Sequence, residues 1–220
     1  MRIFIGYDSK EPQAFATLAH SIYTRASQPV SIIPLTLDSL KGIYTRTRSP
    51  LESTEFSLTR FLVPYLCGYG NYPAVFMDCD MLCKTDICEL LQYVGEHPSP
   101  VSCVQHQYHP KTTVKMDEQT QTPYAKKNWS SLMLFYPALC KKLTLDYVNT
   151  ASGLQLHQFK WIPPHHHIGK LPLEWNWLVG EYPKNDNAKI LHYTLGGPWL
   201  HPYRNTDHAD DWFNVHKEIC

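Results

Sequence analysis

The start of the chain alternates between apolar runs that suit strands and an amphipathic run that suits a helix. Arg2–Tyr7 and Val30–Pro34 are predicted to be strands. Between them, apolar side chains recur at helical spacing from Phe15 to Ile22, and Asp8-Ser9 is predicted to cap that helix. Two strands joined by a crossover helix pair in parallel. We therefore expect an α/β fold with a mostly parallel central sheet flanked by helices.

The rest of the chain continues this pattern and then becomes irregular. Further helices and strands are expected at Glu55–Leu66, Ala74–Met77, Asp86–Val94, Val101–Gln105, Leu132–Tyr136 and Pro137–Thr150, the first of these shortened by Pro64. The polar segment His106–Lys127 is predicted to be a mobile loop over a cleft. After Gly153, aromatic residues and prolines predict an irregular C-terminal third. Without a repeat or a linker, residues 1–220 are expected to form a single domain.

Charge and cysteine content narrow the classes of function. Lys+Arg and Asp+Glu are equal at 20 each, so no overall attraction to nucleic acid or acidic lipid is expected. The seven cysteines lack the spacing of a disulfide framework or a zinc site and are expected to be buried thiols of a cytoplasmic protein. No signal-peptide pattern precedes the first strand. Leu132–Cys140, the longest apolar stretch, is too short to cross a bilayer, so any membrane association is expected to be peripheral.

Two carboxylates, Asp78 and Asp80, follow the apolar strand expected at Ala74–Met77 and are called the acidic pair below. Alternate side chains of an extended segment share a face, so both can point to the same place. Carboxylates held together repel each other unless a cation lies between them, and a divalent metal is the usual remedy. Because α/β sheets bind ligands beyond the carboxyl ends of their strands, a metal site is favoured over a solvated loop.

A second candidate site runs from His192 to Trp199. His192 follows a short expected strand, Ile190-Leu191, and a neutral imidazole suits manganese as a third ligand. Gly196 and Gly197 allow backbone N–H groups to approach an anion without obstruction by a Cβ. Taken alone, a buried core histidine and an ordinary turn explain this segment as well. Together with the acidic pair, a site for a metal ion and a phosphate is favoured.

The order of these features resembles that of the GT-A glycosyltransferases, in particular glycosyltransferase family eight, the glycogenin and lipopolysaccharide galactosyltransferase group. The resemblance runs from Ile3 to Trp199 and is most specific at Phe76–Asp80 and at His192–Trp199. It implies a GT-A fold and a metal-dependent, hexosyltransferase-like enzyme that retains anomeric configuration. It also implies a nucleotide-sugar donor, most commonly a UDP-sugar with Mn²⁺ or Mg²⁺, and a glycan, lipid-linked or protein acceptor.

The resemblance also implies roles for individual residues. A metal ion is expected at Asp78, Asp80 and His192, with the last two as its direct ligands. The residues implied for the nucleotide and the donor are Tyr7, Asp8, Arg60, Cys79, Gly196, Gly197 and Lys170. The candidates for the acceptor side and for catalysis are Asn128, Gln158, Glu174, Asn176 and Trp199.

This sequence departs from the family pattern in three places. Gly197 stands where the family has the lysine that neutralises the diphosphate, so Lys170 and Arg204 are the candidates to replace it. Asn128 is one residue out of register with the family's asparagine. The family's Asp-Gln pair near the reacting carbon is only echoed by His157-Gln158.

Other interpretations stay open. A nucleotidyltransferase also uses paired aspartates, but Asp8–Pro12 is a poor version of its Gly-rich and basic loop. A glycosidase needs two carboxylates that flank a sugar, and Glu174 is the obvious partner for the acidic pair. The missing lysine and the position of Asn128 favour a catalytically weak or inactive protein that binds a nucleotide sugar. His165–His167 invites a second metal site, although a polar loop explains it better.

Overall fold

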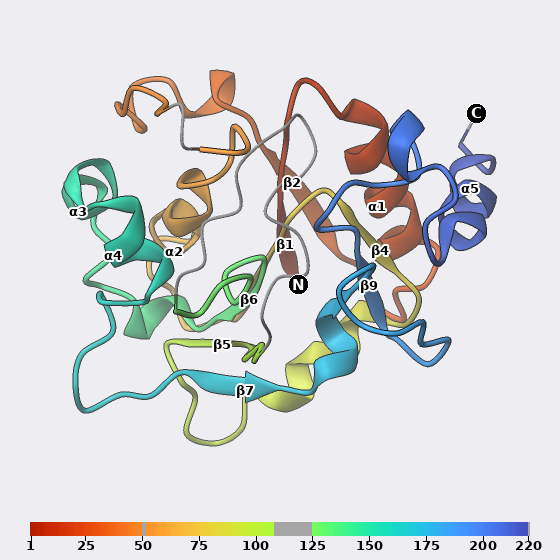
Figure 1. The fold of residues 1–220 in the computed structure, drawn as a ribbon. Coiled ribbons are helices and arrows are strands. Elements are labelled where there is room, and N and C mark those ends of the chain that lie inside the picture. Colours follow the sequence, from red (N-terminus) through yellow and green to blue (C-terminus); the bar gives the residue numbers. More distant parts are fainter. Residues whose placement is uncertain (50–51, 108–124, 220) are drawn as a thin grey trace.

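The structure, a computed structural model, describes residues 1–49, 52–107 and 125–219. Its strands form two sheets (Figure 1). The main sheet has the spatial order β2 (Ser31–Leu35), β1 (Arg2–Gly6), β3 (Ala74–Met77), β6 (Leu132–Phe135), β5 (Val101–Val104) and β7 (Gly169–Leu171). The second sheet has the order β4 (Met81–Cys83), β9 (Ile190–His192) and β8 (Trp177–Leu178). Most of the loop expected over a cleft, residues 108–124, lies outside the described residues.

The directions of the strands confirm the expected α/β fold. β1 pairs in parallel with β2 and β3, and β5 pairs in parallel with β7. β6 pairs antiparallel with both β3 and β5, so among the described strands of the main sheet it alone runs against the others. The central sheet is therefore mostly parallel. Its strands β1 and β2 are joined by α1 (Pro12–Tyr23), a crossover helix long enough to connect parallel strands.

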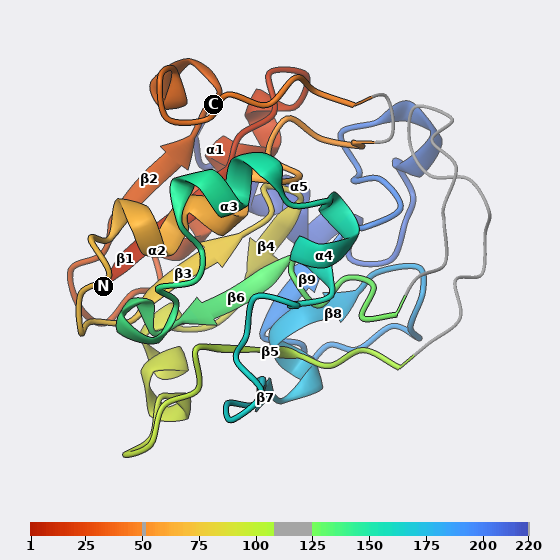
Figure 2. The same cartoon turned by 90° about the vertical axis from the view of Figure 1, so that its left-hand side faces the viewer.

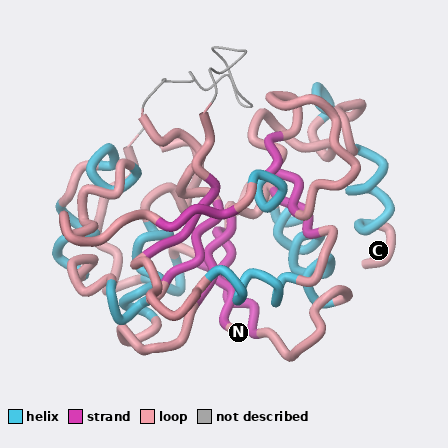
Figure 3. Tube along the Cα trace, turned by 90° about the horizontal axis from the view of Figure 1, so that it is seen from below, coloured by secondary structure: helices cyan, strands magenta, loops and turns pink. Residues whose placement is uncertain are grey.

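Helices cover both sides of the strands (Figure 2; Figure 3). The remaining α-helices are α2 (Val63–Leu66), α3 (Leu145–Thr150), α4 (Gly153–His157) and α5 (Ala209–His216). Short 3₁₀ helices lie at Asp38–Leu40, Thr59–Leu62, Ile87–Tyr93, Pro137–Leu139, Leu173–Asn176 and His201–Tyr203. α1 and α5 lie against each other on one flank, whereas α2, α3 and α4 gather on the other (Figure 1). No helix in the described ranges is long and apolar enough to cross a membrane.

Several expected helices are shorter than their sequence pattern, for reasons that are local. The helix expected at Glu55–Leu66 begins only at Thr59, as a 3₁₀ turn, and Pro64 lies in the first turn of α2. The helix expected at Pro137–Thr150 is interrupted, and α3 begins after Thr144, whose side chain accepts a hydrogen bond from a backbone N–H of the helix. The expected cap by Asp8-Ser9 is wrong, because the residue that precedes α1 is Glu11, without a side-chain cap.

Burial explains where the strands lie. All four side chains of β3 are buried, which is typical of a strand covered on both faces. The main hydrophobic core surrounds the main sheet. A smaller hydrophobic cluster, here called the second core, packs around the second sheet and α5. Its buried members are Leu82, Val179, Ala188, Leu191, Tyr193, Trp212 and Val215.

Candidate active site

The acidic pair lies where the chain passes from one sheet to the other. β3 of the main sheet ends at Met77, and β4 of the second sheet begins at Met81. In the antiparallel pairing of β4 with β9, Met81 faces His192. The backbone N–H of the residue after His192 donates a hydrogen bond to the carbonyl of Asp80 at 2.9 Å. The pairing of two short strands therefore brings His192 beside Asp80.

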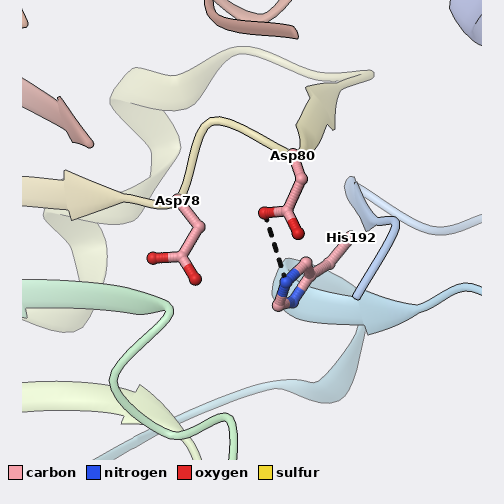
Figure 4. A group of neighbouring side chains, drawn as sticks. All are labelled: Asp78, Asp80 and His192. Carbon is pink, nitrogen blue, oxygen red and sulfur yellow. Dashed lines mark ion pairs between the residues drawn. The ribbon is translucent and has the colours of Figure 1, made fainter. Parts of the chain in front are cut away.

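The three side chains offer ligand atoms that suit a divalent metal ion. One oxygen of Asp78, one oxygen of Asp80 and one ring nitrogen of His192 all lie within 4.8 Å of one another. His192 Nε2 lies 3.4 Å from Asp80 Oδ1, and both carboxylates extend to the same side of the connecting segment (Figure 4). Manganese accepts mixed nitrogen and oxygen ligands. The donor set thus fits the metal ion that the sequence predicts.

Arg60 lies directly against the acidic pair. Its guanidinium forms an ion pair with Asp78 Oδ1 at 2.8 Å and donates to the carbonyl of Ser130 at 2.9 Å. The guanidinium carbon lies 5.4 Å from the ring centre of Phe56 and 4.9 Å from that of Phe76. Only 5% of Arg60 is exposed, so the ion pair is buried. Arg60 is therefore not a surface side chain, and its carboxylate partner belongs to the candidate metal site.

Hydrogen bonds hold His192 from behind. Its Nδ1 lies 2.9 Å from Asn176 Oδ1, and Asn176 Nδ2 donates to Ser131 Oγ at 2.8 Å. Asn176 is fully buried, which favours the structural role that the sequence also suggested for it, whereas a role on the acceptor side stays a prediction. Asn128 has a left-handed backbone, with φ of 61°, and its Nδ2 donates to Thr194 Oγ1 at 3.3 Å. Asn128 therefore lies beside the segment that follows His192, and its acceptor-side role stays a prediction.

Two of the expected donor-side residues follow β1, the strand next to β3. Asp8 is 5% exposed, and its carboxylate accepts backbone hydrogen bonds from Lys10 at 3.0 Å and from Glu55 at 3.1 Å. The ring of Tyr7 packs edge-on against Phe15, with 5.6 Å between ring centres. Because β1 and β3 are parallel neighbours, both residues emerge at the same edge of the sheet as the acidic pair. Their role toward a nucleotide stays a prediction.

Cys79, between the two aspartates, has a side chain that is 1% exposed. Burial raises the pKa of its thiol well above the usual value, and the carboxylate of Asp80 raises it further. A donor contact from this residue would therefore involve its backbone. The described cysteines confirm the expectation of buried thiols, since all except the half-buried Cys88 are buried.

The two glycines after His192 are required for a reason that the sequence did not show. Gly196 has φ of 141°, and its N–H donates to the carbonyl of Tyr193 at 2.8 Å. A Cβ on Gly196 would lie 2.4 Å from the ring of Tyr203, and one on Gly197 would lie 2.0 Å from the ring of Trp199. The interpretation of Gly196 as a phosphate-cradling amide is corrected, because that amide closes a turn. For Gly197 the phosphate contact stays a prediction.

Gly197→Ala is expected to lower the free energy of unfolding by about 1–3 kcal/mol, because the ring of Trp199 must move to admit the new methyl group. Urea denaturation measures the change. Gly70→Ala is the matched control, since its added Cβ would meet its nearest neighbour at an ordinary 3.4 Å. Equal unfolding midpoints for the two variants would contradict the packing argument.

The two residues expected to replace the missing lysine both have exposed side chains. Lys170 is exposed on β7, an edge strand that is separated from β3 by β6 and β5. Three strand spacings of about 4.8 Å place it about 14 Å from β3. Arg204 is exposed, and its guanidinium carbon lies 5.4 Å from the ring centre of Phe213. This distance disfavours Lys170 as the residue that neutralises the diphosphate, and the role of either residue there stays a prediction.

Glu174 lies two residues before Asn176, in the same short 3₁₀ helix. Its carbonyl accepts a hydrogen bond from the backbone of Lys189, the residue that precedes β9, whereas His192 ends that strand. Nearby, Lys189 forms an ion pair with Glu89. The backbone of Glu174 is thus anchored at the end of β9 opposite His192, and a role of its side chain as a catalytic base or acceptor clamp stays a prediction.

Trp199 is largely a packing residue. Its ring lies 6.0 Å from that of Tyr193 and 5.0 Å from that of Trp212, both buried members of the second core. Trp199 itself is half-buried. These contacts favour the core interpretation over a platform for stacking on a sugar ring.

Gln158 follows α4 and is half-buried, and its carbonyl accepts a hydrogen bond from Lys126 Nζ at 2.9 Å. The preceding His157 lies 2.7 Å, from Nδ1 to Oγ, from Ser130, which also binds Arg60 through its carbonyl. Burial lowers the pKa of His157 to about 3, and the charge of Arg60 contributes to this. His157 is thus neutral and lies near Arg60, whereas a catalytic role for Gln158 stays a prediction.

His106 is a candidate that the sequence analysis did not single out. It follows β5, is 6% exposed, and its Nδ1 lies 2.9 Å from the hydroxyl oxygen of Tyr182. Burial lowers the pKa of His106 to about 3, with a smaller contribution from His192. Its position beyond the carboxyl end of a strand is the same signal that marked the acidic pair. The distant Tyr182 carried no comparable signal.

Together, the mostly parallel sheet, the second sheet and the acidic pair at their junction define a protein of the GT-A glycosyltransferase fold. Three similar structures are the WbbM bifunctional glycosyltransferase, the galactosyltransferase LgtC with donor and acceptor sugar analogs, and mouse xyloside xylosyltransferase 1. Their identities to this chain are 16%, 10% and 13%, with TM-scores of 0.66, 0.59 and 0.52. At such identities the likeness establishes the fold alone.

The likenesses differ in extent. They cover 98%, 99% and 87% of this chain, and 49%, 96% and 96% of the respective structures, so the chain spans about half the length of WbbM. No protein-family model matches the sequence. The chain belongs to the family of Protein CDI from Arabidopsis thaliana, to which it is 43% identical over 226 residues. That match covers 99% of this chain and 86% of the Arabidopsis protein.

Proposed function

We propose that this protein is a metal-dependent glycosyltransferase that moves a sugar from a nucleotide sugar to an acceptor. The observation that carries the proposal is the cluster of Asp78, Asp80 and His192, where the two sheets meet on a GT-A fold. The similar structures named as a galactosyltransferase and a xylosyltransferase support sugar transfer. A UDP-sugar donor, retention of configuration and a glycan, lipid-linked or protein acceptor rest on the family resemblance.

The charges of the site explain how it would hold a donor. A divalent ion at Asp80 and His192, with Asp78 beside them, supplies positive charge to a departing diphosphate. Because Arg60 is paired with Asp78, the acidic pair and this guanidinium together carry one net negative charge. The loaded site would therefore be net positive, which favours an anionic leaving group. Tyr7 and Asp8, at the same sheet edge, are the proposed contacts of the nucleotide.

The proposal is tested with a panel of nucleotide sugars and the purified chain. Slow, Mn²⁺-dependent release of a nucleoside diphosphate from a UDP-sugar, abolished by a chelator, is the expected result. Release is measured with and without added Mn²⁺ or Mg²⁺, in the absence of an acceptor. The absence of both turnover and binding across the panel would contradict the proposal.

A second candidate function is the binding of a nucleotide sugar without efficient turnover. It is favoured by Gly197 in the position of the family's lysine and by the distance of Lys170 from the acidic pair. A thermal-shift screen with the same panel distinguishes the two functions. Stabilisation by a nucleotide sugar without diphosphate release would favour the binding protein. In a separate assay with a nucleoside triphosphate and a sugar phosphate, release of pyrophosphate would indicate a nucleotidyltransferase.

A further inference from the structure

The hydrogen bonds behind His192 form a chain with a fixed direction. Ser131 Oγ donates its hydrogen to the carbonyl of Asn128 at 2.7 Å. A hydroxyl has one hydrogen, so toward Asn176, at 2.8 Å, the same oxygen must accept. The NH₂ group of Asn176 therefore points at Ser131, and its carbonyl oxygen points at His192.

This direction determines which nitrogen of His192 carries a hydrogen. Asn176 Oδ1 lies 2.9 Å from His192 Nδ1, and an amide oxygen can only accept, so Nδ1 must donate. The other ring nitrogen, Nε2, faces Asp80 Oδ1 at 3.4 Å. We propose that Asn176, oriented by Ser131, is a positioning residue that keeps neutral His192 in its Nδ1–H form and presents the Nε2 lone pair to a metal ion.

Burial makes this arrangement selective. Asn176 is 0% exposed, and Ser131 and His192 are each 2% exposed, so water has little access to any of the three. A flipped amide would turn its NH₂ group toward Nδ1 and would require the Ser131 hydroxyl to release the carbonyl of Asn128. Partners of this kind fix the tautomer and ring orientation of metal-binding histidines in general.

The proposal has two separable parts. The tautomer of His192 follows from the hydrogen bonds alone, whereas its effect on metal affinity rests on the proposed function. The first part is measured on metal-free protein by nitrogen NMR of the imidazole rings, which distinguishes the two neutral forms from the charged ring. The second part is measured as the Mn²⁺ dissociation constant by titration calorimetry.

Three variants test the role of the amide. Asn176→Leu removes the acceptor, and we expect His192 to lose the Nδ1–H form and Mn²⁺ affinity to fall by about 10–100-fold. Asn176→Asp keeps an acceptor oxygen toward Nδ1, so the Nδ1–H form is expected to persist. Ser131→Ala leaves the NH₂ group of Asn176 with only a longer contact, 3.5 Å to the carbonyl of Asn128, so a mixture of tautomers with weaker Mn²⁺ binding is expected. The milder serine variant keeps the test decisive if Asn176→Leu does not fold.

Asn149→Ala is the matched control. Asn149 is also an amide with a partner on each side, here the backbone N–H of Thr45 and the backbone carbonyl of Ile43, but it lies on α3. Its loss is expected to change neither the tautomer of His192 nor the Mn²⁺ affinity. The proposal is overturned if wild-type His192 is in its Nε2–H form, or if folded Asn176→Leu keeps both the wild-type tautomer and affinity. An Nδ1–H wild type that binds no Mn²⁺ would instead overturn the proposed metal site and leave the tautomer assignment standing.

Discussion

Asp80→Asn is expected to reduce Mn²⁺-dependent release of the nucleoside diphosphate by about 10²–10³-fold. The amide keeps the size of the carboxylate but loses the negative charge that faces His192 Nε2. It would therefore bind a divalent ion weakly and leave the charge of the departing diphosphate poorly stabilised. Steady-state rates at saturating donor, together with Mn²⁺ titration calorimetry, measure the effect.

Asp86→Asn is the matched control for this variant. Asp86 lies a few residues further along the chain, where its carboxylate accepts hydrogen bonds from the backbone of Cys88 at 2.9 Å and of Ser27 at 3.2 Å. Asparagine is an equally good cap, so the rate and the stability are expected to stay close to wild type. A wild-type rate and Mn²⁺ dependence in Asp80→Asn would show that the cluster does not hold the ion.

Arg60→Met is expected to lower the free energy of unfolding by about 3–5 kcal/mol. The methionine can fill the apolar space between Phe56 and Phe76, but Asp78 is left without the guanidinium that lies 2.8 Å away. A buried charge without its counter-charge is strongly destabilising. Since a typical domain is stable by about 5–15 kcal/mol, urea denaturation followed by circular dichroism should detect the loss readily.

A double-mutant cycle separates the charge effect from packing. Adding Asp78→Asn to Arg60→Met removes the uncompensated charge and is expected to recover part of the lost stability. Lys189→Met is the matched control, because it breaks the ion pair with Glu89. The side chain of Lys189 is 28% exposed and that of Glu89 is 40% exposed. Pairs of this exposure contribute about 0–1 kcal/mol. Equal losses for Arg60→Met and Lys189→Met would contradict a buried ion pair.

The parts of the fold that the sequence predicted well are those that burial alone determines. β3 has the predicted bounds, Ala74–Met77, because each of its side chains is buried and polar residues follow at once. The partnership of His192 with the acidic pair was also predicted, because His192 follows an expected strand and an imidazole suits a metal ion, and the family resemblance supported it. Its structural cause, the pairing of β4 with β9, involves strands of three residues, which are too short to show a periodicity.

The parts that failed depend on contacts between distant segments. The missing Cβ of Gly196 was interpreted as room for an anion, whereas in the structure the ring of Tyr203 occupies that space. Lys170 was proposed for its charge, but its strand joins the sheet at the edge beyond β5, an order that does not follow the chain. The sequence also did not show that Arg60 pairs with Asp78, because the two residues are brought together only by the tertiary fold. Pattern and propensity describe local structure, and these errors are all of tertiary origin.

The junction between the two sheets has a consequence for the partial unfolding of the molecule. Asp78 follows β3 of the main sheet. Asp80 precedes β4 and His192 ends β9, and these two strands pair in the second sheet. An ion bound by all three would have to be released before the second core could separate from the main hydrophobic core. Its binding energy would then be added to the cost of that partial unfolding. The ion would thus stabilise the contact between the two cores, and backbone amides of β8 and β9 would exchange their hydrogens with solvent more slowly when it is bound.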